Sequence, residues 1–170
     1  MDLLEPPRVV ERPDADYLGI RVVTPFRGML SVRNELIDEL SAWLVQQGID
    51  DVGMFFLRLH VIDMNGPMDL EVGVTTSGPL AGDDRVRPAV LPAGRYATLT
   101  YRNHSLRANR ALLDWAGAEA LSLDRRDTPE GDLFGCRYEL FRTDPRKEPR
   151  KTKWQVELNI RLTTPPAPKN

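Results

Sequence analysis

The order of sequence patterns repeats in the two halves of this chain, and this repetition restricts the fold more than any other feature. In the first half, a run rich in β-branched residues at 17–23 predicts a strand. A helical pattern then extends from Ser31, the predicted N-cap, to Gly48. Two alternating runs follow, at 55–63 and 68–75. The first half is therefore predicted to be β-α-β-β.

The second half repeats this order with a strand, a helix and two strands, at residues 96–101, 105–121, 134–141 and 154–162. Two repeats are too few for a solenoid, whose units need stacked neighbours. We therefore predict one α+β domain over residues 1–170, built from duplicated β-α-β-β repeats with an antiparallel sheet and a pseudo-two-fold central cleft. The repeats fall at about 8–76 and 85–163, and a tail occupies 164–170.

The last two strands of each half also agree residue by residue. A gap-free alignment of the third strands places His60 on Glu139. The same comparison of the fourth strands places Glu71 on Glu157. A carboxylate therefore stands at the same point of the final strand in each repeat.

Alternation along these strands assigns their polar side chains to one face of the sheet. If Asn65-Gly66 forms a two-residue hairpin turn, His60 lies opposite Glu71. Pro67 lacks an amide hydrogen and can lengthen the turn, but a shift of two residues keeps both side chains on that face. The other members of this polar face are expected to be Phe56, Arg58, Arg137, Glu139, Glu157 and Asn159. The side chains expected to face the helices include Leu57, Leu59, Tyr138, Leu140, Val156 and Leu158.

The polar face has two interpretations. In the first, it is the solvated side of an antiparallel sheet, where charged pairs contribute about 0 to 1 kcal/mol. In the second, the halves meet across it around a cleft that holds Glu157 or Glu71 among Tyr17, Phe56 and Tyr96. A buried carboxylate without a partner raises its pKa or attracts a cation, so such a cleft favours cationic aromatic ligands. The same group suits a general acid or base.

Composition excludes several classes of protein. The formal net charge is −2 and the sequence pI is about 5.7, so no nucleic acid partner is expected. The single cysteine, Cys136, cannot form an internal disulfide. No signal-like or membrane-spanning apolar run is present. We therefore expect a soluble cytoplasmic protein that does not associate with a membrane.

Motifs for metals and cofactors are also missing from the sequence. His60 and His104 lie in different halves, without the spacing of a zinc site. No P-loop, GxGxxG or GxSxG motif occurs. We expect no metal and no cofactor. Segments 77–94 and 142–153 are predicted to be exposed connections, because they are rich in glycine, proline or charge.

Two segments, AGRYATLTY (93–101) and TDPRKEPRKTKWQVELNI (143–160), together with the doubled β-α-β-β order, resemble the GyrI-like, or AraC-type, effector-binding family. The resemblance covers nearly the whole domain. It implies a cleft that binds hydrophobic or cationic aromatic compounds through a glutamate near the final strand, and Glu157 matches that glutamate. Candidate aromatic walls are Phe56, Tyr96 and Tyr101, although alternation puts the last of these on the opposite face.

The main hypothesis is that the chain binds a small hydrophobic organic molecule, cationic or aromatic, in the central cleft. Many members of the resembled family carry a helix-turn-helix segment, for which the N-terminal run leaves no room, so we expect a stand-alone member. The candidate ligand-binding residues are Tyr17, Phe56, Arg58, His60, Glu71, Tyr96, Tyr101, Glu139 and Glu157.

Two alternatives remain open at this stage. One is a hydrolase, as the resemblance extends to members that open cyclopropane rings. Glu157 or Glu139 would activate water, and the Tyr96 hydroxyl would support proton transfer. The other is a module that modulates a protein partner through an exposed surface. The sequence does not predict the oligomeric state.

Overall fold

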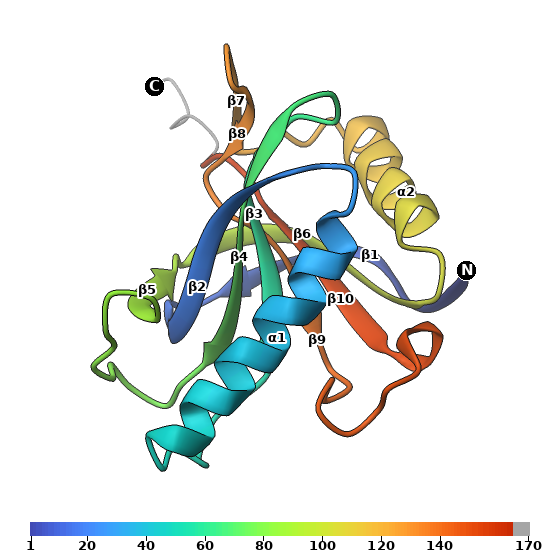
Figure 1. Cartoon of the computed structure of the whole chain (residues 1–170). Helices are drawn as coiled ribbons and strands as arrows, with labels where there is room; N and C mark the ends of the chain where they lie inside the picture. The colour runs from blue at the N-terminus through green and yellow to red at the C-terminus, as the bar shows by residue number, and fades with distance from the viewer. Residues whose placement is uncertain (165–170) are drawn as a thin grey trace.

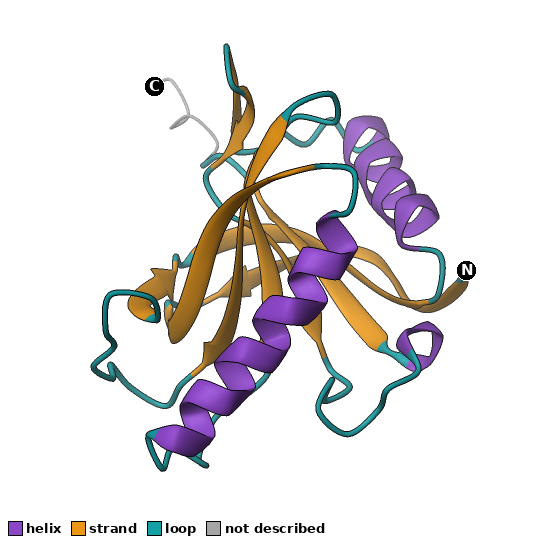
Figure 2. Ribbon diagram, in the orientation of Figure 1, coloured by secondary structure: helices purple, strands orange, loops and turns teal. Residues whose placement is uncertain are grey.

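The chain folds into one large, twisted antiparallel sheet with both long helices on the same side (Figures 1 and 2). The structure is a computed structural model and describes residues 1–164. The α+β class and the antiparallel sheet predicted from the sequence are confirmed. The predicted tail lies, from residue 165 onward, outside the described residues.

The strands are β1 (Asp2–Arg12), β2 (Ala15–Pro25), β3 (Phe55–Ile62), β4 (Pro67–Thr75), β5 (Arg87–Leu91), β6 (Gly94–Arg102), β7 (Arg125–Thr128), β8 (Gly131–Phe134), β9 (Arg137–Phe141) and β10 (Gln155–Arg161). The helices are α1 (Met29–Gln46), α2 (Ser105–Ala118) and the short 3-10 helix η1 (Lys151–Lys153). The first half thus contains the predicted order as β2-α1-β3-β4, and the second as β6-α2-β9-β10 with β7 and β8 inserted.

The strand order across the sheet is symmetric about its centre. It runs β1-β6-β10-β9-β3-β4-β2-β5, so β9 of the second half pairs with β3 of the first. The two edge strands are exchanged, because β1 pairs with β6 and β5 pairs with β2. The halves therefore join edge to edge in one sheet through the pairing of β3 with β9. Duplication of the sequence itself stays a prediction.

The larger core lies between the sheet and the helices. On α1, Leu36, Leu40 and Leu44 recur at four-residue spacing and are buried, as the helical pattern predicts. They pack against the leucines and valines of the sheet face that includes Leu57 and Leu158. Each fully buried leucine contributes about 1.5 to 3 kcal/mol of transfer free energy, so this stripe fixes α1 on the sheet.

A second, aromatic core fills the opposite face of the sheet. Phe56 makes edge-on contacts with Tyr17 and Tyr138, at 4.8 and 5.9 Å between ring centroids, and Tyr96 contacts Tyr138 at 5.9 Å. All four rings are at most 6% exposed. Gly73 lies beneath the Phe56 ring, because a Cβ there would stand 2.4 Å from the ring. These rings, which come from both halves, form the second and smaller core of the molecule.

The sequence analysis did not predict β1, β5 or β7, and β8 shares only Phe134 with the predicted strand 134–141. β1 lies in the proline-rich opening, and β5 lies in the segment 77–94 that we expected to be a connection. Both are edge strands, where proline is tolerated because one side of the strand needs no ladder donor. Pro6 and Pro7 coincide with a register shift between β1 and β6. Proline content therefore misled the prediction at both sheet edges.

The hairpin between β3 and β4 is longer than the predicted two-residue turn. Leu59 pairs with Leu70 and Arg58 with Glu71, so the register differs by two residues from that turn. The connection spans 63–66, where Asp63 accepts from the Asn65 amide, and a bulge follows Leu59. The shift of two keeps Arg58, His60 and Glu71 on their predicted face.

The residues that the structure describes contain no helix with both the length and the apolar character needed to cross a bilayer. Over the same residues, no group of three or more histidine, cysteine, aspartate or glutamate side chains is arranged to hold a metal ion.

Candidate functional site

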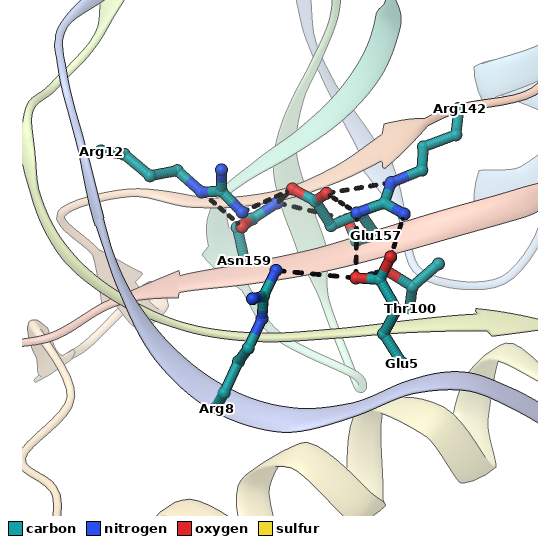
Figure 3. Close-up of polar contacts among 7 residues, drawn as sticks. All are labelled: Glu5, Arg8, Arg12, Thr100, Arg142, Glu157 and Asn159. Atoms are coloured by element: carbon teal, nitrogen blue, oxygen red, sulfur yellow. Dashed lines mark hydrogen bonds and ion pairs between the residues drawn. The ribbon is translucent and has the colours of Figure 1, made fainter.

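Glu157, the glutamate expected to select a cationic ligand, is already bound by two arginines (Figure 3). Arg12 Nη2 donates to Glu157 Oε1 at 2.7 Å, and Arg142 Nη2 donates to Oε2 at 2.5 Å. Asn159 Nδ2 also donates to Oε1, at 3.0 Å. Glu157 is buried, and both of its oxygens accept charged hydrogen bonds. A cationic ligand would have to displace a guanidinium to reach this carboxylate.

Arg142 also binds Glu5 of β1 through two hydrogen bonds, of 2.6 and 3.1 Å. Its contacts with Glu5 and Glu157 raise the pKa of Arg142, and the hydrogen bond from Arg142 lowers the pKa of Glu5. The contacts tie β1 and the segment before η1 to β10. We call the residues drawn in Figure 3 the Glu157 network: Glu5, Arg8, Arg12, Thr100, Arg142, Glu157 and Asn159.

Glu71, the counterpart of Glu157 in the first half, has a different environment. Its Oε1 accepts a hydrogen bond from the Tyr17 hydroxyl at 2.7 Å and lies 2.8 Å from His60 Nε2. Arg58 Nη1 donates to the Tyr17 hydroxyl at 3.1 Å. Burial and the Glu71 charge raise the pKa of Tyr17, so this phenol stays protonated. The His60–Glu71 contact confirms that these two side chains share a face.

A pocket of about 660 Å³ opens beside Glu71 on this side of the sheet. We call it the Glu71 pocket, and it is lined by Tyr17, Gly19, Arg21, Arg58, His60, Glu71, Asp84, Arg85, Arg87, Pro88 and Ala89. The aromatic core separates it from the Glu157 network, because Phe56 on β3 and Tyr138 on β9 lie between the two carboxylates. The structure therefore does not bring Glu71 and Glu157 into one cleft.

Glu139 and Tyr101 lie on the helix side, so the expectation that Glu139 shares the polar face with Glu157 is wrong. The gap-free alignment fails at Gly135, where β8 ends before β9 begins. Phe134 packs in the helix-side core, yet Cys136, two residues later, packs in the aromatic core. The facing of β9 is therefore reversed relative to the prediction, for all of Arg137, Tyr138, Glu139 and Leu140.

The helix side carries a groove between the N-terminal ends of α1 and α2. One hollow, of about 710 Å³, is lined by Phe26, Arg27, Gly28, Met29, Leu30, His104, Ser105, Leu106 and Arg107. An adjoining hollow of about 240 Å³ shares part of this lining and extends over Arg33, Asn34, Tyr101, Asn103, Lys151, Thr152, Trp154 and Val156. We call the two hollows together the interhelical groove.

Backbone geometry shapes both ends of this groove. Gly28 precedes α1 with φ of 87°, so the helix begins at Met29 and the predicted N-cap, Ser31, lies inside its first turn. Asn103 and His104 precede α2 with φ of 61° and 66°. The left-handed region costs a non-glycine residue about 1 kcal/mol, and such residues cluster at functional sites.

The floor of the interhelical groove combines aromatic rings with a resident cation. The Arg33 guanidinium lies 5.2 Å from the ring centroid of Trp154 and 5.8 Å from that of Phe141. Burial lowers the pKa of Arg33, while the charge of Glu139 opposes that shift. Among the described residues that line the groove, four are arginine or lysine and none is acidic. The groove thus presents apolar surface with positive charge at its rim.

Glu139 lies beneath the groove, on β9 between Leu57 and Leu158 of the neighbouring strands. Burial raises its pKa, and the positive charges of Arg137 and Arg33 oppose this shift. Within residues 1–164, no arginine or lysine lies within ion-pair distance of it. A charged ligand in the groove is therefore expected to shift the pKa of Glu139.

Sequence reasoning missed the interhelical groove, although one signal was present. Leu30 and Leu106 are apolar residues near the starts of the two helices, and they are 50% and 72% exposed. Neither fits the buried stripe of its helix. Apolar side chains outside the stripe, at the same end of two helices, indicate an exposed apolar surface.

Comparison with solved structures shows that this fold is shared. The EcmrR C-terminal domain superposes with a TM-score of 0.65 at 15% identity, over 95% of this chain and 99% of that one. The structure of SAV2435 bound to tetraphenylphosphonium superposes with a TM-score of 0.59 at 10% identity, over 92% of this chain and 93% of that one. A hydrolase from Listeria innocua superposes with a TM-score of 0.56 at 10% identity, over 94% of this chain and 92% of that one. At these identities the likeness shows the fold alone.

Among curated proteins, none matches the chain at a significant level. Residues 5–163 match the family described as the GyrI-like small molecule binding domain, which covers nearly the whole sequence. The sequence match and the shared fold agree with each other and with the resemblance noted above. The chain therefore belongs to the GyrI-like family of small-molecule-binding domains.

Proposed function

We propose that this protein binds a small apolar, aromatic organic molecule in the interhelical groove. The observation that carries the proposal is the apolar hollow of about 710 Å³ at the N-terminal ends of α1 and α2. This volume is typical of small-molecule sites, which range over roughly 300 to 1,000 Å³. Family membership supports ligand binding in general.

The charges around the groove favour a neutral or anionic ligand. The rim carries Arg27, Arg107 and Lys151, and the floor carries Arg33. The cation preference expected from the sequence depended on an available glutamate. Glu157 is bound by two arginines, and Arg33 already occupies the position over the aromatic floor that an organic cation would take. We therefore assign the wild-type groove to aromatic ligands without positive charge.

A matched set of naphthalene derivatives tests this proposal by calorimetric titration. The set comprises naphthalene-2-sulfonate, 2-naphthylmethanol and 2-naphthylmethylammonium, which share a ring system and differ in charge. The sulfonate and the alcohol are expected to bind saturably, with the ammonium compound weaker by about tenfold or more. Tightest binding of the ammonium compound, or saturable binding of none, would contradict the proposal.

Replacing Leu106 by aspartate is expected to weaken sulfonate binding by about tenfold. The variant removes an apolar contact at the groove mouth and adds a charge that repels the ligand. Leu106 is 72% exposed, so the substitution leaves the core intact. Val45→Asp is the matched control, because Val45 is an apolar residue at the far end of α1 and is 80% exposed. If both variants lose the same affinity for the sulfonate, the ligand does not bind in the interhelical groove.

Hydrolysis of a groove ligand is a second candidate function. The observation that favours it is that Glu139, with its raised pKa, and Tyr101 lie together under the groove, where the Glu139 charge contributes to raising the Tyr101 pKa. Each bound compound is to be recovered and analysed after incubation with wild type and Glu139→Gln. Product formed only by wild type would support an enzyme, and intact ligand from both proteins would leave a binding protein.

A further inference from the structure

Glu71 is a buried carboxylate with only one of its two oxygens engaged. Oε1 is in contact with both the Tyr17 hydroxyl and His60 Nε2. Within residues 1–164, no hydrogen bond reaches Oε2. That oxygen lies against Gly19, where a Cβ would stand 2.6 Å from it. The absence of a side chain at Gly19 therefore leaves Glu71 free to present Oε2 toward the Glu71 pocket.

The position of Glu71 is fixed by its partners. Tyr17 is 2% exposed, and its hydroxyl also accepts from Arg58. Arg58 Nη1 also donates to the Val90 carbonyl oxygen and Nη2 donates to that of Gly135, while the buried Arg58 Nε has no partner among the described residues. The carboxylate is thus oriented by a buried chain of hydrogen bonds, which removes most of the entropic cost of ordering it on binding. An oriented acceptor of this kind suits an N–H or O–H donor of a ligand.

Apart from Glu71, the pocket lining carries an excess of positive charge, with four arginines against one carboxylate, Asp84. Arg21 and Arg85 line it, but Asp69 and Glu39 already pair with them. Arg58 and Arg87 also line it, and across the described residues neither has a carboxylate within ion-pair distance. A simple organic cation is disfavoured here, whereas an acidic group on the ligand finds guanidinium donors.

We propose that the Glu71 pocket is a second binding site, for a small molecule that carries a carboxylate next to an N–H or O–H donor, as amino acids and 2-hydroxy acids do. The donor binds Glu71 Oε2, and the carboxylate binds the arginine side of the pocket. This site is polar and lies on the opposite face of the sheet from the interhelical groove. It is independent of the function proposed for that groove.

Glu157 provides a matched control within the same chain. It stands at the aligned position of the final strand in the second half, but Arg12 and Arg142 occupy both of its oxygens. Conversion of either glutamate to glutamine removes one buried charge at a similar depth, since both residues are 4% exposed. Only the change at Glu71 alters an oxygen that a ligand can reach.

The test is a ligand-observed NMR screen of the protein with the twenty common amino acids and with lactate, malate and tartrate, each alone. At least one probe is expected to bind saturably, and its methyl ester to bind about tenfold more weakly. Glu71→Gln and Arg87→Ala are each expected to weaken binding of the unesterified probe about tenfold. Glu157→Gln and Leu106→Asp are expected to leave its affinity unchanged. Arg87 is exposed on an edge strand, so its variant keeps the fold.

Two outcomes would overturn the proposal. The first is that no probe in the screen binds saturably to a wild-type protein whose unfolding transition is normal. The second is a bound probe whose affinity is the same in Glu71→Gln as in Glu157→Gln. Neither result would bear on the groove, because the naphthalene titration reports on that site separately.

Discussion

Replacing Arg142 by alanine is expected to lower the free energy of unfolding by about 2 to 3 kcal/mol. Arg142 binds Glu157 and Glu5 together, and its loss leaves the buried Glu157 carboxylate with Arg12 as its one remaining charged partner. Breaking a buried ion pair from one side costs several kcal/mol when the other charge stays desolvated. Denaturation by urea, with Arg142→Ala and wild type compared at one pH, measures the difference.

The control for this prediction lies on the same segment of the chain. Arg146 pairs with Asp144 across two residues, and this pair is more exposed. Arg146→Ala is expected to cost less than about 1 kcal/mol. If the Arg142 and Arg146 variants lose the same stability, the Glu157 network is not a structural element. A double variant, Arg142→Ala with Glu157→Gln, is expected to regain part of the loss, because the unpaired charge is gone.

Replacing Arg33 by alanine is expected to raise the affinity of the groove for tetraphenylphosphonium by roughly a hundredfold, equivalent to about 2.7 kcal/mol. The variant removes the Arg33 guanidinium from the rings of Trp154 and Phe141, and leaves Lys151 Nζ at 5.7 Å from the Trp154 centroid. It also removes one of two positive charges that act on Glu139. A ligand cation then gains both the aromatic faces and the buried carboxylate. Calorimetric titration of the two proteins gives the ratio.

Arg27→Ala separates this local effect from a general change of charge. Arg27 lines the mouth of the same groove, and it is not among the charges that shift the pKa of Glu139. Its removal changes the net charge equally, so a gain of only a few fold is expected. Equal gains in Arg27→Ala and Arg33→Ala would contradict the assignment of Arg33 as the resident cation.

The parts of the fold that sequence predicted are those that local patterns encode. The stripe of Leu36, Leu40 and Leu44 identified α1, and alternation identified β3, β4 and β10. Alternation also placed Glu71 and His60 on one face, where they are in contact. These predictions hold because a side-chain period of 3.6 or 2 is fixed by backbone geometry alone.

The errors arise where a local irregularity or a distant contact decides the outcome. The interruption at Gly135 reversed the facing of β9 and moved Glu139 to the helix side, which no periodic pattern signals. The Arg12–Glu157 contact joins residues 145 positions apart. This contact depends on the pairing of β1 with β6 of the second half. The prolines of β1 kept that strand from being predicted. The surroundings of Glu157 therefore could not be predicted from its position in the sequence.

The central claim, that the interhelical groove is the aromatic-ligand site, is tested most directly by two-dimensional amide NMR with naphthalene-2-sulfonate. We predict saturable shifts at Leu30, Leu106 and the Trp154 indole, while the amides of Glu71 and Glu157 on the opposite face stay in place. Shifts that concentrate at Glu157 or Glu71 and leave Leu106 and Trp154 unchanged would contradict the claim.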